Sequence, residues 1–193
     1  KSPYVINEEN ARATLEETRQ PCGIPSLLDR DVSYLAYVSM GKLKTVIAAA
    51  QAAAKGGMDE NLKKADDALK LVAGGGLDEI VYPWASAEAG VFQYEKNDDP
   101  VLFLRLLDKG AWERAKSKLL NSIVLSSDSS LIVDSARVSK INLPWYAEAI
   151  MKAAGLSMSL PYFVERDDYL FFSENPAMLA KTANGGKNGS TLA

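Results

Sequence analysis

The fold of this chain is decided by one stretch, residues 88–120, which reads EAGVFQYEKNDDPVLFLRLLDKGAWERAKSKLL. Two runs rich in apolar residues flank a polar turn, and alternation in the second run places Leu102, Leu104 and Leu106 on one face of a strand. The opposite face of that run is also apolar, which is typical of a central strand covered on both sides. The pattern therefore predicts a strand, a turn, a second strand and then a helix capped by Asp108.

Two consequences follow for the core of this unit. Burying one leucine side chain is worth about 1.5–3 kcal/mol, so we expect the second strand to anchor the core, with Leu104 as a core residue. Helical spacing in the segment after Asp108 predicts that Trp112, Ala115 and Leu119 face the sheet.

A shorter stretch with the same order of elements lies near the end of the chain, in residues 161–183, PYFVERDDYLFFSENPAMLAKTA. Asn175 and Pro176 form an N-cap and first-turn pair that opens its helix. Residues 34–50 would be a partial third copy that lacks the first strand. One interpretation is an internal duplication, in which both helices pack on the same face of the sheet. The alternative is that strand followed by helix is a common local pattern.

The rest of the chain supports an α+β fold, with a mainly antiparallel sheet built from strand–strand–helix units and helices packed on it. The further predicted elements are a surface helix over 7–20, a strand over 31–40, helices over 42–55 and 60–73, a short connector over 77–84, one or two strands within 122–143, and a helix over 144–154. We expect an N-terminal helix and lead-in (1–30), a single α+β domain with an internal repeat (31–184) and a flexible tail (185–193).

Composition excludes several classes of function. The 193 residues are 47% hydrophobic and 24% charged, as in an ordinary globular protein, and the net charge of -3 gives no reason to expect nucleic-acid binding. Histidine is absent and Cys22 is the single cysteine, which excludes His-based catalysis, His-ligated metals and Cys-only metal sites. We expect no cofactor and no metal. No apolar run approaches the roughly 20 residues of a membrane span. Because the sequence begins with Lys1, we interpret it as a processed chain or an excerpt.

The strongest catalytic candidate is the string from Ser39 to Lys42, which has the S-x-x-K spacing of penicillin-binding proteins and serine β-lactamases. Asp128 and Lys187 follow in the order expected for such enzymes. However, Ser39 ends a predicted strand, and Gly41 separates it from the helix that would carry the lysine. We therefore expect Ser39 to be structural.

Other polar and aromatic clusters have simple structural explanations. The carboxylate pairs 66–67, 98–99 and 167–168 could hold a hard cation or act in a glycosidase, but two of them lie in predicted turns, where aspartate is favoured. The glycines 74–76 follow a helix, as in a C-cap, whereas a phosphate loop precedes one. Trp84 and Trp145 each adjoin a proline near an element boundary, and with Tyr146 they are the candidates for a surface contact.

Three motifs together resemble a domain-of-unknown-function family of uncharacterised extracytoplasmic bacterial proteins. They are YLAYVSMGKLKTVIAAA, the pair PWASAEAGVFQYE and PVLFLRLLDKGAWERAKSKL, and the closing LPYFVERDDYLFFSENPAMLAKTA. The match spans most of residues 31–184, although Asp167-Asp168 stands where the family pattern has Asp-Gly. The resemblance implies a location in the periplasm or cell envelope and the architecture described above, and it implies no chemistry.

The sequence thus leads to one functional expectation and one alternative. The expectation is a non-catalytic extracytoplasmic binding or scaffold module of a larger bacterial envelope protein, with a protein or envelope partner. The alternative is a histidine-free hydrolase that uses Ser39 and Lys42 or a pair of carboxylates.

Overall fold

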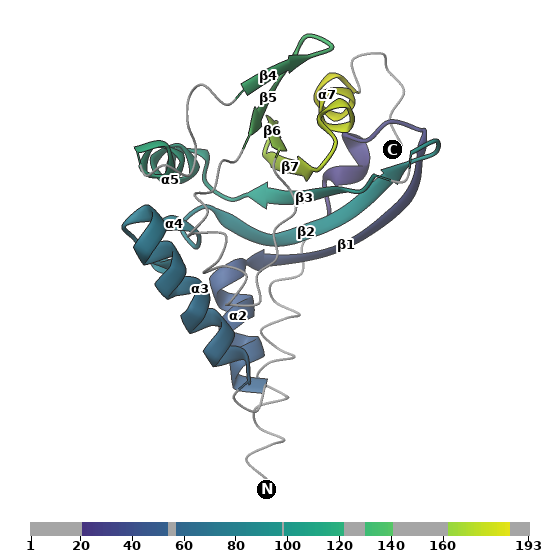
Figure 1. The fold of residues 1–193 in the computed structure, drawn as a ribbon. Helices are drawn as coiled ribbons and strands as arrows, with labels where there is room; N and C mark the ends of the chain where they lie inside the picture. The colour runs from purple at the N-terminus through teal and green to yellow at the C-terminus, as the bar shows by residue number, and fades with distance from the viewer. Residues whose placement is uncertain (1–20, 54–56, 98, 122–129, 141–161, 186–193) are drawn as a thin grey trace, which may run out of the picture.

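The structure is a computed structural model that describes residues 21–53, 57–97, 99–121, 130–140 and 162–185. In these residues, seven strands form one antiparallel sheet in the order β1-β2-β3-β7-β6-β5-β4, and helices pack on both faces of the sheet (Figure 1). The expected α+β class is confirmed.

The order of strands and helices along the described parts of the chain largely follows the sequence prediction. The strands are β1 (Val32–Lys42), β2 (Ala85–Tyr94), β3 (Val101–Leu106), β4 (Ser130–Val133), β5 (Ala136–Lys140), β6 (Tyr162–Arg166) and β7 (Tyr169–Ser173). The helices are the 3-10 turn η1 (Ile24–Ser26), α2 (Leu43–Ala53), α3 (Gly57–Ala73), α4 (Leu77–Ile80), α5 (Lys109–Asn121) and α7 (Pro176–Asn184). The predicted helices over 7–20 and 144–154 and the tail after 185 lie outside the described residues.

The two predicted hairpins, β2–β3 and β6–β7, meet through β3 and β7 at the centre of the sheet. On β3, Val101 and Phe103 are almost completely buried on one face, and Leu106 is buried on the other. Leu104 is only half-buried, because the helix on its face lies nearest to the Leu106 end of the strand. The central position of the strand is therefore confirmed, whereas Leu104 is a peripheral member of the core.

Helices α5 and α7 lie on opposite faces of the sheet. Trp112 of α5 packs in one cluster with Leu170 of β7, whereas Leu179 of α7 packs in a second cluster with Phe171. Neighbouring residues of a strand point to opposite faces, so the two helices cover different faces. The expected placement of both helices on one face, which an internal duplication required, is wrong. A central sheet that is apolar on both faces needs a cover on each of them.

The helix that closes the chain begins as predicted. The Asn175 side chain accepts a hydrogen bond from the Ala177 N–H at 2.9 Å, and Pro176 occupies the first turn. Leu179 and Ala180 are fully buried. The cap and the buried stripe together fix α7 against β5, β6 and β7.

The lead-in before β1 belongs to the core. Ile24 and Leu28 are buried to 0% and 1% exposure and pack in the same cluster as Leu179 of α7. Figure 1 shows the purple η1 segment beside α7, on the inner side of the curve formed by β1 and β2. The boundary expected at residue 30 therefore does not separate two units, because two apolar side chains on the lead-in fill the space beside α7.

The turns follow the backbone preferences of their residues. Gly74 adopts a φ of 67° and its N–H donates to the Lys70 carbonyl at 3.1 Å, so the glycine run ends α3 as a C-cap. Asp134 and Ser135 both have positive φ values in the two-residue loop between β4 and β5, as a type I′ turn requires. Residues 130–140, the described part of the region 122–143, thus contain two strands. No helix in the described part of the chain is both long and apolar enough to cross a membrane.

Candidate functional site

The candidate site lies at an irregularity of β2, where the side chain of Glu88 is buried inside the protein. The pairing of β2 with β3 slips between Ala85 and Ala89, so residues 86–88 lie opposite Arg105 alone. Such a β-bulge disrupts the ladder and redirects side chains. The disrupted Glu88 N–H donates instead to the Ser86 Oγ at 3.0 Å, and the Ser86 hydroxyl donates to the Gly41 carbonyl at 3.2 Å.

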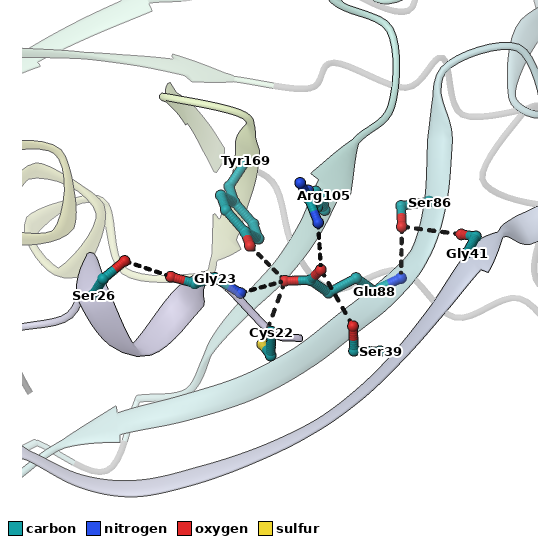
Figure 2. A network of polar contacts seen from close by, with 9 residues as sticks. All are labelled: Cys22, Gly23, Ser26, Ser39, Gly41, Ser86, Glu88, Arg105 and Tyr169. Atoms are coloured by element: carbon teal, nitrogen blue, oxygen red, sulfur yellow. Dashed lines mark hydrogen bonds and ion pairs between the residues drawn. The ribbon is translucent and has the colours of Figure 1, made fainter. Parts of the chain in front are cut away.

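The Glu88 carboxylate lies inside the protein, with the residue only 1% exposed. Its Oε1 accepts hydrogen bonds from the hydroxyl of Tyr169, from the Gly23 N–H at 3.3 Å and from the Cys22 thiol at 3.3 Å (Figure 2). Two of these three donors come from the lead-in segment before η1. The carboxylate therefore ties the lead-in to β2 and β7.

The second oxygen of Glu88 connects the same carboxylate to β1 and β3. Oε2 accepts from Arg105 Nη1 at 3.0 Å and from the Ser39 Oγ at 3.3 Å (Figure 2). The Arg105 side chain is 31% exposed and that of Glu88 is 2% exposed, so this ion pair is largely shielded from water. Together the two oxygens connect β2 to four other segments: the lead-in, β1, β3 and β7.

The surroundings lower the pKa of Glu88. Burial alone would raise it, but the hydrogen bonds from Tyr169, Cys22 and Arg105, with the positive charge of Arg105, outweigh burial and hold the pKa below its ordinary value of 4.5. Burial, followed by the hydrogen bond to Glu88 and its negative charge, raises the pKa of the Tyr169 phenol. Glu88 is thus a stable anion that faces a phenol and a thiol in their neutral forms.

The Cys22 thiol is a poor nucleophile in this position. Burial is the largest cause of a pKa raised to about 11. The Ile24 backbone acts against burial, and the hydrogen bond to Glu88 and the charge of Glu88 add to the increase. The thiolate is the reactive form of cysteine, and a pKa this high leaves little of it at neutral pH.

Glu88 is an equally poor general base. A carboxylate offers about four lone-pair positions, and five donors already converge on this one. A lowered pKa also weakens its affinity for a substrate proton. Within this network, the groups that could act as acid, base or nucleophile are therefore hydrogen-bonded to one another.

The predicted catalytic string does not form a serine–lysine pair. β1 continues through Gly41 to Lys42, so both residues of the string lie on a strand. The Ser39 hydroxyl donates to Glu88, whereas Lys42 is exposed. This agrees with a structural role for Ser39. Asp128 and Lys187, the other members of the proposed motif, lie outside the described residues.

The paired carboxylates have the separate partners that turn and helix chemistry predict. Asp66 accepts from the Leu77 N–H at 2.7 Å, Asp99 accepts from the Asn175 amide at 2.6 Å, and Asp168 pairs with Lys109 at 3.1 Å. Within the described ranges, no group of three or more His, Cys, Asp or Glu residues could hold a metal ion. The pairs therefore do not converge on one site there.

The prediction of a surface contact at Trp84 is wrong, because this residue is buried. Its side chain is 7% exposed, its Nε1–H donates to the Ile80 carbonyl, and its ring meets Trp112 edge-on with a centroid separation of 4.7 Å. Trp84 follows the short helix α4 and packs against residues of α5, so its ring is part of the core. The other two candidate contacts, Trp145 and Tyr146, lie outside the described residues.

Sequence reasoning missed the residues that form the buried network. Glu88 and Arg105 each stand as a single charged residue inside an apolar run, and a charge at such a position needs a partner when it is buried. This signal marks both residues as noteworthy. It does not reveal that they contact each other, or that Tyr169 and Cys22 join them.

A second feature of the surface is the outer strand of the sheet. β1 lies at one edge among the described strands and runs for 11 residues. Tyr34, Tyr37 and Val38 on this strand are 51%, 52% and 45% exposed. No charged residue occurs between Asp31 and Lys42. The edge is therefore long, apolar and without the charges that usually prevent further strand pairing.

Comparison of the chain with protein-family models, curated proteins and solved structures found no match. The resemblance to extracytoplasmic bacterial proteins therefore stays a prediction that rests on sequence motifs.

Proposed function

We propose that the chain is a non-catalytic binding or scaffold module that holds a protein partner along the edge of β1. The observation that carries this proposal is the 11-residue edge strand, which has no charged residue before Lys42 at its end and carries three exposed apolar side chains. An open strand edge binds an extended segment through backbone hydrogen bonds, and alternate side chains supply specificity.

The non-catalytic part of the proposal is supported by the buried network. Glu88 is held as an anion by five donors, and the thiol of Cys22 is neutral. The Ser39 hydroxyl donates its hydrogen bond to Glu88, and Lys42 is exposed to solvent. Neither version of a histidine-free hydrolase is favoured by these contacts.

We also propose an extracytoplasmic setting, in which this chain is one module of a larger protein of a bacterial envelope. The support for this setting is the resemblance of the three sequence motifs. The setting matters for the edge, because a partner would then be a neighbouring envelope protein or another module.

Site-specific photocrosslinking tests the proposed contact surface. A photoreactive amino acid is placed at Tyr34 or at Tyr37 in the full chain, and at exposed Ser117 on α5 as the matched control. We expect discrete protein adducts in the producing cells from the two edge positions and none from position 117. Equal labelling at all three positions, or no adduct from the edge, would overturn the proposal.

A fluorophosphonate probe tests the non-catalytic part separately. We expect no covalent label on Ser39, because its hydroxyl donates to a weakly basic carboxylate. Stoichiometric labelling of Ser39 that disappears in a Ser39→Ala variant would instead favour the hydrolase.

A further inference from the structure

We infer that β1 pairs with β1 of a second copy of this chain, antiparallel and about a two-fold axis at Ala36, so that two sheets join into one. This inference deepens the proposed function, on which it rests, by naming the partner. It depends on the exposure of the edge, the direction of its backbone groups and the pattern of its side chains.

The edge of β1 differs from the opposite edge of the sheet. In the described part of the chain β4 has 4 residues, and short edge strands are a usual protection against further pairing. β1 has 11 residues and carries neither proline nor charge between Val32 and Gly41. Tyr34 and Val38 lie on one face of the strand and Tyr37 on the other, and all three are about half exposed or more. Both faces of the edge thus offer apolar surface.

The backbone of β1 presents suitable groups to a new strand. Gly90 of β2 lies so close to Ala36 that a Cβ there would be 2.3 Å from the Ala36 carbonyl oxygen. The peptide groups of Ala36 therefore point toward β2. Because these directions alternate along an antiparallel strand, the N–H and C=O groups of Leu35 and Tyr37 point away from β2, toward the open side.

The side chains of β1 are complementary to themselves. When two copies pair about Ala36, Leu35 of one copy lies opposite Tyr37 of the other, and Tyr34 lies opposite Val38. The next pair joins Ser33 to Ser39. The exposed apolar side chains thus meet apolar partners, and the serines meet each other. The sequence from Val32 to Met40, VSYLAYVSM, has nearly the same chemical character in both directions.

The hydrogen-bond geometry suits this register. Leu35 and Tyr37 would form a hydrogen-bonded pair through their outward peptide groups, whereas Tyr34 and Val38 would form a pair without backbone bonds. Side chains approach more closely in the second kind of pair, which places the aromatic ring of Tyr34 against a β-branched residue. An antiparallel pairing of identical strands also closes as a dimer with two-fold symmetry.

A second copy explains these features better than a different protein does. The central edge has no charge through which a charged partner could be distinguished, whereas its side-chain pattern is complementary to itself. The hydroxyls of Ser33 and Ser39 already bond to β2, to the Gln93 carbonyl and to Glu88, so pairing leaves them satisfied. The same strand therefore supplies both halves of the interface.

Cysteine cross-linking tests the register. The experiment uses the full chain with Cys22→Ser, which removes the single native thiol, together with Ala36→Cys or, as control, Ser33→Cys. Two residues at the axis would have Cα atoms about 4.5 Å apart, within disulfide range. The two copies of position 33 would be about 20 Å apart. We expect a disulfide-linked dimer from Ala36→Cys only. Equal cross-linking of both variants would overturn the register.

The mass of the full chain in solution tests the dimer independently of any cysteine variant. We expect sedimentation to give the mass of two chains, and Tyr37→Lys to give the mass of one without a change in circular dichroism. Leu71→Lys, at another exposed apolar residue, should remain a dimer. A monomeric parent at all concentrations overturns the inference. If edge photocrosslinks then reach a different protein, the proposed function still stands, and if they reach no protein, both fail.

Discussion

The two faces of the central sheet are held by different kinds of interaction. The face covered by α5 is closed by aromatic and aliphatic contacts, with Trp84 and Trp112 edge to face. The face covered by η1 and α7 combines a core rich in phenylalanine with the buried Glu88 network. The stability that apolar packing contributes depends on the buried area and on the shape of the side chains. The stability that the network contributes depends on how well the hydrogen-bond donors match the charge of Glu88.

This difference predicts how each face responds to substitution. Removing a side chain from an apolar face leaves a cavity, and the loss in free energy of unfolding increases with the volume of that cavity. Removing the charge at the centre of a buried network leaves its partners without an acceptor, and its cost follows their desolvation. The four predictions below separate these responses, from the largest expected effect to the smallest.

The largest effect is expected from Phe103→Ala on β3. Phe103 is 1% exposed and packs beneath η1 and α7, so its loss should lower the free energy of unfolding by about 3–5 kcal/mol. The control is Leu104→Ala, the next residue on the same strand but on the α5 face. Because Leu104 is half-buried, its loss should cost about 1–2 kcal/mol. Urea unfolding measures both free energies, and equal costs would contradict the difference in burial between these positions on the two faces.

The second effect is expected from Glu88→Gln. The substitution preserves the size of the side chain but removes the charge that pairs with Arg105. It should lower the free energy of unfolding by about 2–4 kcal/mol. The matched control is Glu113→Gln, an exposed carboxylate on α5, which should change stability by about 0.5 kcal/mol or less. A Glu88 variant as stable as the control would show that the network contributes nothing to the fold.

The third effect is a dependence on pH. The folded-state pKa of Glu88 is depressed, so its contribution is complete above the unfolded value of about 4.5 and is lost as the pH falls through the folded value. The parent should therefore lose stability in acid more steeply than Glu88→Gln does, and the two unfolding free energies should converge. Denaturant titrations between neutral pH and pH 3 measure this. A constant difference between the two proteins would exclude Glu88 as the source.

The smallest effect concerns the reactivity of Cys22. Its pKa is raised from 9.0 to about 11, so alkylation of the folded protein at pH 8 should be about 100-fold slower than that of the denatured protein. Glu88→Gln removes one negative charge and should accelerate the reaction without reaching the denatured rate, because burial of the thiol remains. Iodoacetamide kinetics report the rate. An unchanged rate in the variant would show that burial alone protects the thiol.

The sequence by itself determined the local elements of this protein. Asn175 and Pro176 mark the start of α7, Gly74 marks the end of α3, and alternation identifies β3 as a strand apolar on both faces. The helix predicted to follow Asp108 is α5, which begins at Lys109. These signals act over a few residues, through backbone preference and side-chain direction, so they can be interpreted from neighbouring positions alone.

Only the tertiary structure decided which elements meet. Arg105 lies 17 positions from Glu88 and Tyr169 lies 81 positions from it, and no local pattern joins them. The placement of α5 and α7 on opposite faces, and of Trp84 inside the core, depends in the same way on distant segments. The partners of a buried charge and the sheet face that each helix covers are determined only when the strands assemble. Each side chain then contacts residues that its own segment does not contain.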